Sequence, residues 1–218
     1  RQGLINKVVY DLGCSGFSRA INNGMKIINQ NSEYIVWLNS DTIIGTDSWL
    51  NKMKRVLEFN EACAVGPISN SASHQTFLEV AEKNIESISE KINNIIPSKT
   101  KTFFLNGFCF MMNRATFKEI GYLDEELLPS YGSEDDYCMR INEKKLPMCI
   151  ASNVFVYHYG KTSYKEMRTE LTKQAIKLLE DKWGKDNIDQ KLMLSNIFIK
   201  EERRRILYDL AMRGNLYM

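Results

Sequence analysis

The stretch that decides the fold is Tyr34-Ile-Val-Trp-Leu-Asn-Ser-Asp-Thr42, an unbroken apolar run followed by polar residues. Five consecutive apolar residues are typical of a parallel strand that is covered on both faces. Asn39 and Asp41 follow at the carboxyl end of this strand, where ligands bind in open α/β sheets. An aspartate there can bind a divalent cation, or it can cap the next helix, and this stretch alone leaves both interpretations open.

Helical and strand-like segments alternate on both sides of this stretch. Helices are predicted over 16–29, 47–59, 82–95, 115–120, 134–144 and from 163 onward. Further strands are predicted at 6–10, 62–66, 102–112, 148–151 and 154–159. The alternation predicts an α/β fold whose mixed, mostly parallel sheet is flanked by helices, with a helical C-terminal extension. We expect one domain over 1–164 and the extension over 165–218.

The composition is that of an ordinary globular protein of one domain, or of one domain with an appendage: 218 residues, 44% apolar and 26% charged. Its 29 basic and 27 acidic residues leave a net charge of +2, too balanced for nucleic-acid binding by bulk electrostatics. Five cysteines without a CxxC pair predict reduced, mostly buried thiols in a cytosolic protein.

Three adjacent carboxylates, Glu134, Asp135 and Asp136, open the helix predicted over 134–144. Because a helix N-terminus stabilises anions, we expect all three to stay ionised, which suits a base. The same residues can simply complement the helix, with Asp136 and Arg140 as an i,i+4 pair.

His158 ends a strand-like run in which alternation places it on the same face as Val154 and Val156. A histidine at a strand end is either a metal ligand or a hydrogen-bonded structural residue. The sequence contains no GxxxxGK[ST], GxGxxG, GxSxG or HExxH motif. These absences exclude P-loop NTPases, Rossmann dehydrogenases, α/β-hydrolases and zincins.

Taken together, these signals resemble in order and spacing the family 2 glycosyltransferases, inverting enzymes of the GT-A fold, and especially bacterial members that build surface polysaccharides. No single segment is specific, but their joint order is. The resemblance spans about residues 5–165 and is carried by Gly16–Gly24, Tyr34–Thr42, Val65–Ser73, Asn106–Arg114, Phe117–Glu125, Ser133–Arg140 and Val156–Gly160.

The resemblance implies roles for single residues. Asp41 corresponds to the last acidic position of the DxD-type metal motif, and His158 to a further metal ligand. Glu134, six residues before Arg140, corresponds to the catalytic base, and Asp135 takes that place if the alignment slips by one. The remaining implied positions are donor-binding Asn39, Ser40, Arg19 and Asn23, and acceptor-binding Asn106, Gly107 and Asp136, the last of which can instead support the helix.

The implied reaction moves a sugar from a nucleoside-diphosphate sugar to a hydroxyl with inversion, and Mn or Mg is the implied cofactor. The implied acceptor is a saccharide, a lipid-linked molecule or a protein. We expect a cytoplasmic location, with peripheral contact to the inner face of the membrane through the C-terminal helices.

The family normally begins with a strand–helix–strand unit that binds the base and ribose, and this chain starts after it. We therefore expect the nucleotide-binding region to lack its N-terminal part. The alternative function is a non-catalytic scaffold or partner-binding module derived from such a domain. The enzyme is favoured because the three positions to which the resemblance assigns metal binding or catalysis are all occupied, by Asp41, Glu134 and His158.

Overall fold

The computed structural model describes residues 16–126, 132–160 and 168–212, so the strand predicted at 6–10 lies outside the described residues. The helices are α1 (Phe17–Lys26), α2 (Trp49–Phe59), the short 3-10 helix η1 (Glu82–Asn84), α3 (Ile85–Asn93), α4 (Arg114–Ile120), α5 (Ser133–Glu143), α6 (Arg168–Trp183) and α7 (Lys185–Met212). The strands are β1 (Tyr34–Leu38), β2 (Thr42–Ile44), β3 (Ala64–Ile68), β4 (Lys101–Thr102), β5 (Cys109–Asn113) and β6 (Met148–His158).

The strands form a mixed sheet in the order β1-β5-β3-β6-β2, and β4 also pairs with β6. Among the described strands only β3 and β6 pair in parallel, and the other pairings are antiparallel. The prediction of a mostly parallel sheet is therefore wrong for this part of the chain. The strand β5 lies between β1 and β3 and runs opposite to both. The alternation of helices and strands along the sequence does not determine which strands become neighbours, so it could not predict this arrangement.

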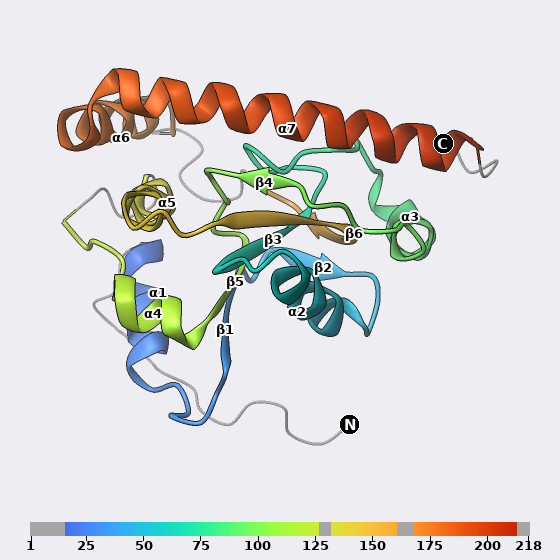
Figure 1. Ribbon diagram of the computed structural model, residues 1–218, viewed down its shortest axis with the longest axis horizontal. Helices are drawn as coiled ribbons and strands as arrows, with labels where there is room; N and C mark the ends of the chain where they lie inside the picture. Colours follow the sequence, from blue (N-terminus) through green and yellow to red (C-terminus); the bar gives the residue numbers. More distant parts are fainter. Residues whose placement is uncertain (1–15, 127–131, 161–167, 213–218) are drawn as a thin grey trace.

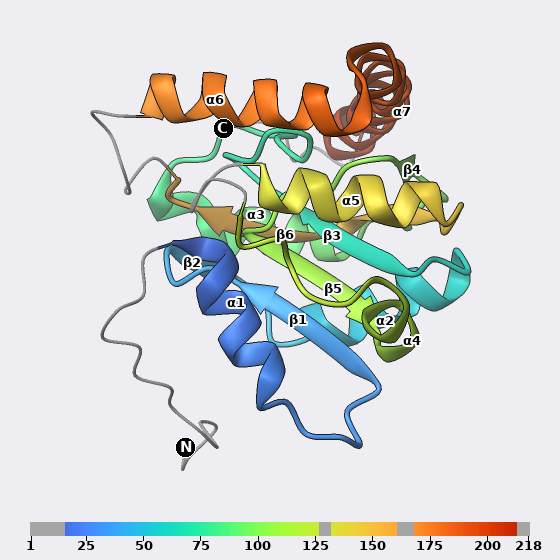
Figure 2. The ribbon, with the colours of Figure 1, turned by 90° about the vertical axis from the view of Figure 1, so that its left-hand side faces the viewer.

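Side chains of the central strands alternate between two apolar clusters, one on each face of the sheet. In β5, Phe110 and Met112 belong to the larger cluster, which α1, α3, α5 and α7 cover. Cys109 and Met111 belong to the smaller cluster, which α2 covers with Met53, Val56 and Leu57. The four described cysteines are buried free thiols, as predicted. Figures 1 and 2 show these layers.

Two features of β6 differ from the prediction. The sequence predicts two strands, but β6 is one strand of 11 residues. Its register shifts where Ala151 and Phe155 face Pro67 and Ile68 of β3, so the irregularity near Ser152-Asn153 interrupts the alternation without ending the strand. Its last residues also pair with β2, for which the sequence predicts no strand.

The C-terminal helices pack on the same core as the sheet. Gly184 separates α6 from α7 with a φ of 79°, a left-handed conformation that favours glycine. Ile199, Ile206 and Leu210 of α7 belong to the larger apolar cluster. Figures 1 and 2 show α6 and α7 along one side of the molecule, with α5 beneath α6. Among the described helices, none combines the length and the apolar character needed to cross a membrane.

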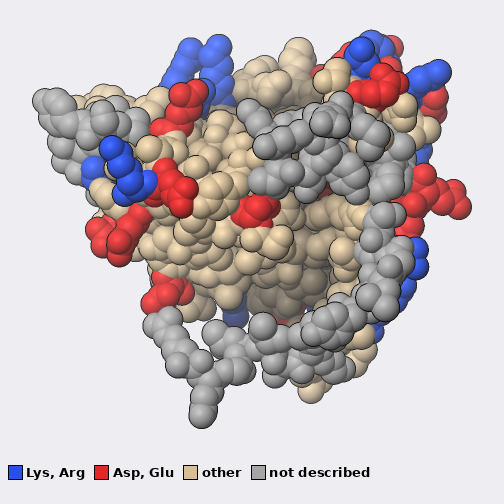
Figure 3. Space-filling model, turned by 180° about the vertical axis from the view of Figure 1, so that it is seen from behind, with Lys and Arg blue, Asp and Glu red and all other residues tan. Residues whose placement is uncertain are grey.

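On the face turned away from Figure 1, acidic and basic side chains lie mostly around the edge, and both signs are interspersed (Figure 3). This distribution accords with the balanced composition of the chain.

Candidate active site

The pairing of β2 with the end of β6 brings Asp41 and His158 together. Thr42 lies opposite His158 in the register, and the Tyr159 N–H donates to the Asp41 carbonyl at 3.0 Å. Asp41 Oδ1 consequently lies 3.4 Å from His158 Nε2. The two residues predicted to bind a metal are therefore neighbours in the structure.

Three residues hold His158 in place, Ser71 and Phe108 through its ring and Asn70 through its backbone. Its Nδ1 lies 2.6 Å from the Ser71 carbonyl oxygen, which can only accept, so Nδ1 carries the proton. The Asn70 amide accepts from the His158 N–H at 2.8 Å and donates to the His158 carbonyl at 3.1 Å. The Phe108 ring stacks on the imidazole at 5.0 Å between centroids. The ring is therefore held with Nε2 turned toward Asp41.

Asp41 and His158 fit a divalent cation. A carboxylate oxygen and an imidazole nitrogen lie 3.4 Å apart, a distance that two ligands of one ion can have. Mg²⁺ and Mn²⁺ commonly take one or two protein ligands and complete their shell with phosphate and water oxygens. A metal-binding histidine usually donates its other N–H to a carbonyl, as His158 does to Ser71. In the part of the chain that the structure describes, no group of three or more His, Cys, Asp or Glu side chains forms a metal site.

The first turn of α5 carries Glu134 and Asp135, both half-buried. Burial raises the pKa of Glu134, and the charge of Asp135 raises it further, against hydrogen bonds from the backbone N–H groups of Glu134 and Gly107. Burial also raises the pKa of Asp135. For Glu134 the raised pKa goes against the expectation that the helix N-terminus keeps it ionised, because that effect is worth only about 0.3–1 kcal/mol. Desolvation of two adjacent carboxylates outweighs it.

Residues 106–108 join the acidic pair to the Asp41–His158 pair. The Gly107 N–H lies near the Glu134 carboxylate and lowers its pKa, and the next residue, Phe108, stacks on His158. The Phe108 carbonyl accepts from the Asn39 N–H at 2.8 Å. Gly107 and Phe108 are neighbours in the chain, with Cα atoms about 3.8 Å apart, so one short segment lies against Glu134 and against His158. Asn106 shapes this segment through its side-chain oxygen, which accepts from the Phe108 N–H at 3.1 Å.

A family model described as "Glycosyl transferase family 2" matches residues 6–121, which is more than half of the chain. The chain belongs to glycosyl transferase family 2. The match includes the Asp41 turn and Asn106–Gly107, and it ends before α5 and β6. A comparison with curated proteins gives no match.

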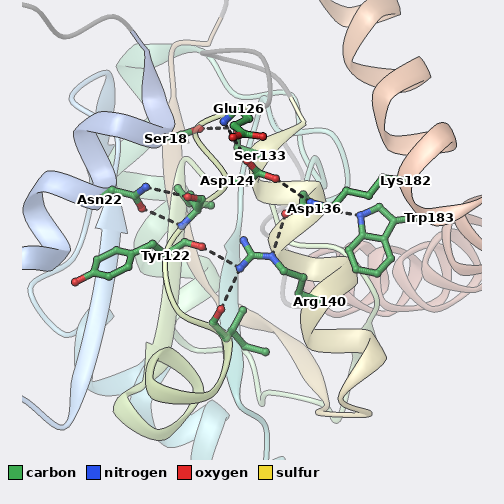
Figure 4. Close-up of polar contacts among 12 residues, drawn as sticks. Ser18, Asn22, Tyr122, Asp124, Glu126, Ser133, Asp136, Arg140, Lys182 and Trp183 are labelled. Carbon is green, nitrogen blue, oxygen red and sulfur yellow. Dashed lines mark hydrogen bonds and ion pairs between the residues drawn. The ribbon is translucent and has the colours of Figure 1, made fainter.

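In this family 2 glycosyltransferase, the acceptor-binding role predicted for Asp136 is not what the structure shows. Asp136 is fully buried, and its carboxylate is bonded to Arg140, Lys182 and Trp183. Figure 4 shows these contacts on the side of α5 that faces α6. Asp136 therefore supports the helix, which was the other role open to it.

The donor-binding residues predicted on α1 and in the β1–β2 turn differ in exposure. Ser40 and Arg19 are exposed, and Asn39 and Asn23 are half-buried. The Lys26 ammonium bonds the Asn23 side chain at 3.2 Å. The structure leaves their donor-binding roles as predictions.

Sequence reasoning missed Asn22, the neighbour of Asn23. Asn22 is buried, donates to the Leu123 carbonyl and the Glu125 carboxylate at 2.9 and 2.8 Å, and accepts from the Leu123 N–H at 2.9 Å. It ties α1 to the segment that leads toward α5. The buried residues of α1 are Ser18, Asn22 and Met25, which follow the i, i+4, i+7 spacing of one helix face. This spacing is the signal from which the role of Asn22 could have been predicted.

Asn70, Ser71 and Gln75 were also missed as supporting residues. All three lie in the Ser/Asn-rich segment 67–76, so its composition was the available signal. Buried Gln75 donates to the Pro67 carbonyl at 2.7 Å and accepts from the Asn106 N–H at 2.6 Å. This loop thus supports both His158 and the segment 106–108.

Proposed function

We propose that this family 2 glycosyltransferase has the GT-A fold and moves a sugar from a nucleoside-diphosphate sugar to a hydroxyl acceptor with inversion. The observation that carries the proposal is that the adjacent residues Gly107 and Phe108 lie against Glu134 and against His158, the partner of Asp41. A cation-binding pair beside a pair of carboxylates is what the transfer of a sugar from a diphosphate requires.

Asp41 and His158 would hold a divalent cation, Mn²⁺ or Mg²⁺. When bound, such an ion supplies positive charge that stabilises the departing diphosphate. The chain's own contribution is orientation, because Ser71 and Phe108 hold the imidazole with Nε2 directed at Asp41, and Asn70 holds the His158 backbone. Asn39 and Ser40, in the turn before Asp41, are the proposed contacts of the donor.

Glu134 or Asp135 is the proposed general base. Its carboxylate takes the proton of the acceptor hydroxyl while the hydroxyl oxygen bonds the anomeric carbon from the side opposite the diphosphate. The bond between that carbon and the diphosphate oxygen breaks at the same time, with oxocarbenium character in the transition state. A raised pKa suits this role, because a base works best when its pKa is near the operating pH.

The biological setting is also part of the proposal. We place the enzyme in bacterial surface polysaccharide or glycoconjugate synthesis, with a saccharide, lipid-linked or protein acceptor. We propose that the chain is cytoplasmic and touches the membrane peripherally through the extension at 165–218. Exposed basic and apolar side chains on α7 support the membrane contact, namely Arg203, Arg204, Tyr208 and Met212.

A thermal-shift series tests the donor site. The melting temperature is measured with UDP, GDP, dTDP and CMP, each with and without Mn²⁺, on the parent chain, on Asp41→Ala and on the exposed control Asp181→Ala. We expect one nucleotide to stabilise the parent and the control only with Mn²⁺, by about 2.7 kcal/mol at a hundredfold excess over Kd. Asp41→Ala should lose this effect. If no nucleotide stabilises a folded parent chain, the non-catalytic module is the better conclusion.

A further inference from the structure

The buried carboxylate of Asp136 is the centre of a polar network on α5 and α6. Its Oδ2 accepts from Arg140 Nε at 3.0 Å. Its Oδ1 accepts from Lys182 Nζ and from Trp183 Nε1, each at 2.9 Å. Two of its three partners thus come from the C-terminal end of α6 (Figure 4). A buried carboxylate that loses such partners is strongly destabilised, so these contacts constrain the helix that carries it.

The network also includes the segment that follows α4. Lys182 Nζ lies 2.8 Å from Asp124 Oδ2, and this contact lowers the pKa of Asp124. Arg140 Nη1 donates to the Ile120 and Tyr122 carbonyls at 3.0 and 2.9 Å. Lys182 therefore bridges two carboxylates that belong to different segments.

Apolar contacts from α6 reach the start of α5 as well. Gly132 precedes the first turn with a φ of 82°, and a Cβ there would lie 3.3 Å from Leu179 Cδ1 and 3.4 Å from the Ala175 Cβ. Ala175, Leu179, Lys182 and Trp183 follow the i, i+4, i+7, i+8 spacing of one helix face. One face of α6 thus covers the N-terminus of α5 and binds Asp136.

Holding Asp136 also determines where Glu134 and Asp135 point. Successive residues of a helix are turned by about 100°, so Glu134 and Asp136 lie about 200° apart around α5. With Asp136 bonded to α6, Glu134 faces the other way, where the Gly107 N–H meets its carboxylate. A rotation of α5 would break both sets of contacts.

The geometry points to Lys182 and Trp183 as positioning residues of the transferase: by bonding Asp136 they fix the rotation of α5 that presents Glu134 and Asp135 to the acceptor. This inference rests on the proposed function. Neither residue is itself among the groups placed at the active site, so their effect passes through Asp136.

The variants that test it keep most of the side-chain volume. Trp183→Phe removes the N–H donor but keeps an aromatic ring, and Lys182→Met removes the charge. Lys182→Arg is the conservative variant that should rescue function. The matched control is Lys185→Met, which removes an exposed lysine two residues beyond Trp183, paired with Glu180 and Asp189.

The first readout is turnover of UDP-glucose, GDP-mannose and dTDP-glucose, followed as nucleotide release at 25 °C. For the substrate that the parent uses, we expect kcat to fall about tenfold in Trp183→Phe and Lys182→Met, with the Kd of the matching diphosphate and Mn²⁺ unchanged within twofold. Lys182→Arg should keep at least half of the parent kcat, and Lys185→Met should match the parent. Unchanged kcat in both folded test variants would overturn the inference, and so would equal losses in kcat and in diphosphate affinity.

The second readout needs no turnover and separates failure of this inference from failure of the proposed function. Amide hydrogen exchange of residues 134–136 is compared between the full-length variants under native conditions. Faster exchange at this turn in Trp183→Phe and Lys182→Met, but not in Lys185→Met, supports the positioning role even if the parent turns over none of the three substrates. Exchange equal to the parent's in both test variants overturns it.

Discussion

At Glu134, two opposing effects act on one carboxylate. The backbone N–H groups of Glu134 and Gly107 favour its charged form, whereas burial and the charge of Asp135 favour its neutral form. The second pair of effects is larger, so the folded chain holds a proton on this carboxyl at a pH where the unfolded chain has released it. This balance links catalysis and stability at a single residue.

The sign of the linkage gives a prediction for Glu134→Gln. In the pH range between the ordinary pKa of a glutamate and the raised pKa in the folded state, the folded chain binds more protons than the unfolded chain. Stability therefore falls as the pH rises through that range. Glu134→Gln removes the penalty, so we expect its free energy of unfolding at pH 8 to exceed the parent's by about 1–2 kcal/mol, and the difference to vanish near pH 4. Urea unfolding at both pH values measures it.

The control is Glu143→Gln, which changes an exposed glutamate at the far end of the same helix. It should leave the free energy of unfolding within about 0.5 kcal/mol of the parent's at both pH values. Transfer activity should fall in Glu134→Gln if Glu134 is the base, and in Asp135→Asn if Asp135 is. A stability gain in Glu134→Gln that is the same at pH 4 and pH 8 would contradict the linkage.

At the scale of elements, the approach of α1 to segment 106–108 depends on Gly107. A Cβ at Gly107 would lie 2.5 Å from the ring of Phe17, the first residue of α1, which is closer than side chains tolerate. Gly24, near the end of α1, has open space around the same position. Replacement by alanine is therefore expected to have opposite effects on stability at Gly107 and at Gly24.

We expect Gly107→Ala to lower the free energy of unfolding by about 1–3 kcal/mol, because the Phe17 ring must move. Gly24→Ala should raise it by about 0.5 kcal/mol, because alanine favours the helix. Chemical denaturation of both variants measures the pair. A neutral Gly107→Ala would show that α1 adjusts freely to segment 106–108, against the close contact in the structure.

At the scale of the whole molecule, the helical extension and the sheet share one apolar core. Ile206 of α7 has no exposed surface and belongs to the cluster that includes Phe110 and Met112 of β5. Ile197 on the same helix is 46% exposed. Burial of α7 against the sheet implies that the two parts of the chain unfold together.

The substitution Ile206→Ala should lower the free energy of unfolding of the whole chain by about 2–5 kcal/mol, because it leaves a cavity in the shared core. Ile197→Ala should change it by less than about 0.5 kcal/mol. Calorimetry and far-UV circular dichroism should each show a single transition in both variants. Two transitions, with the larger one unmoved by Ile206→Ala, would mean that the extension at 165–218 is a separate unit.

The local elements and the chemical types of the site residues could be predicted from the sequence alone. An apolar run predicts β1 at 34–38, helical spacing predicts α2 and α5 to within two residues, and alternation places His158 on the face of β6 that also carries Val154 and Val156. These predictions succeed because periodicity and helix ends are properties of a few neighbouring residues. The pairing of Asp41 with His158 followed only from the resemblance to a family.

Which segments become neighbours is visible only in the folded chain. The insertion of β5 between β1 and β3, the pairing of β2 with β6, and the bonding of Asp136 by Lys182 and Trp183 all join residues that are distant in the chain. The raised pKa of Glu134 likewise depends on the atoms that exclude water from it. Burial, strand neighbours and desolvation depend on how all faces of the molecule pack at once, and a local pattern does not contain that information.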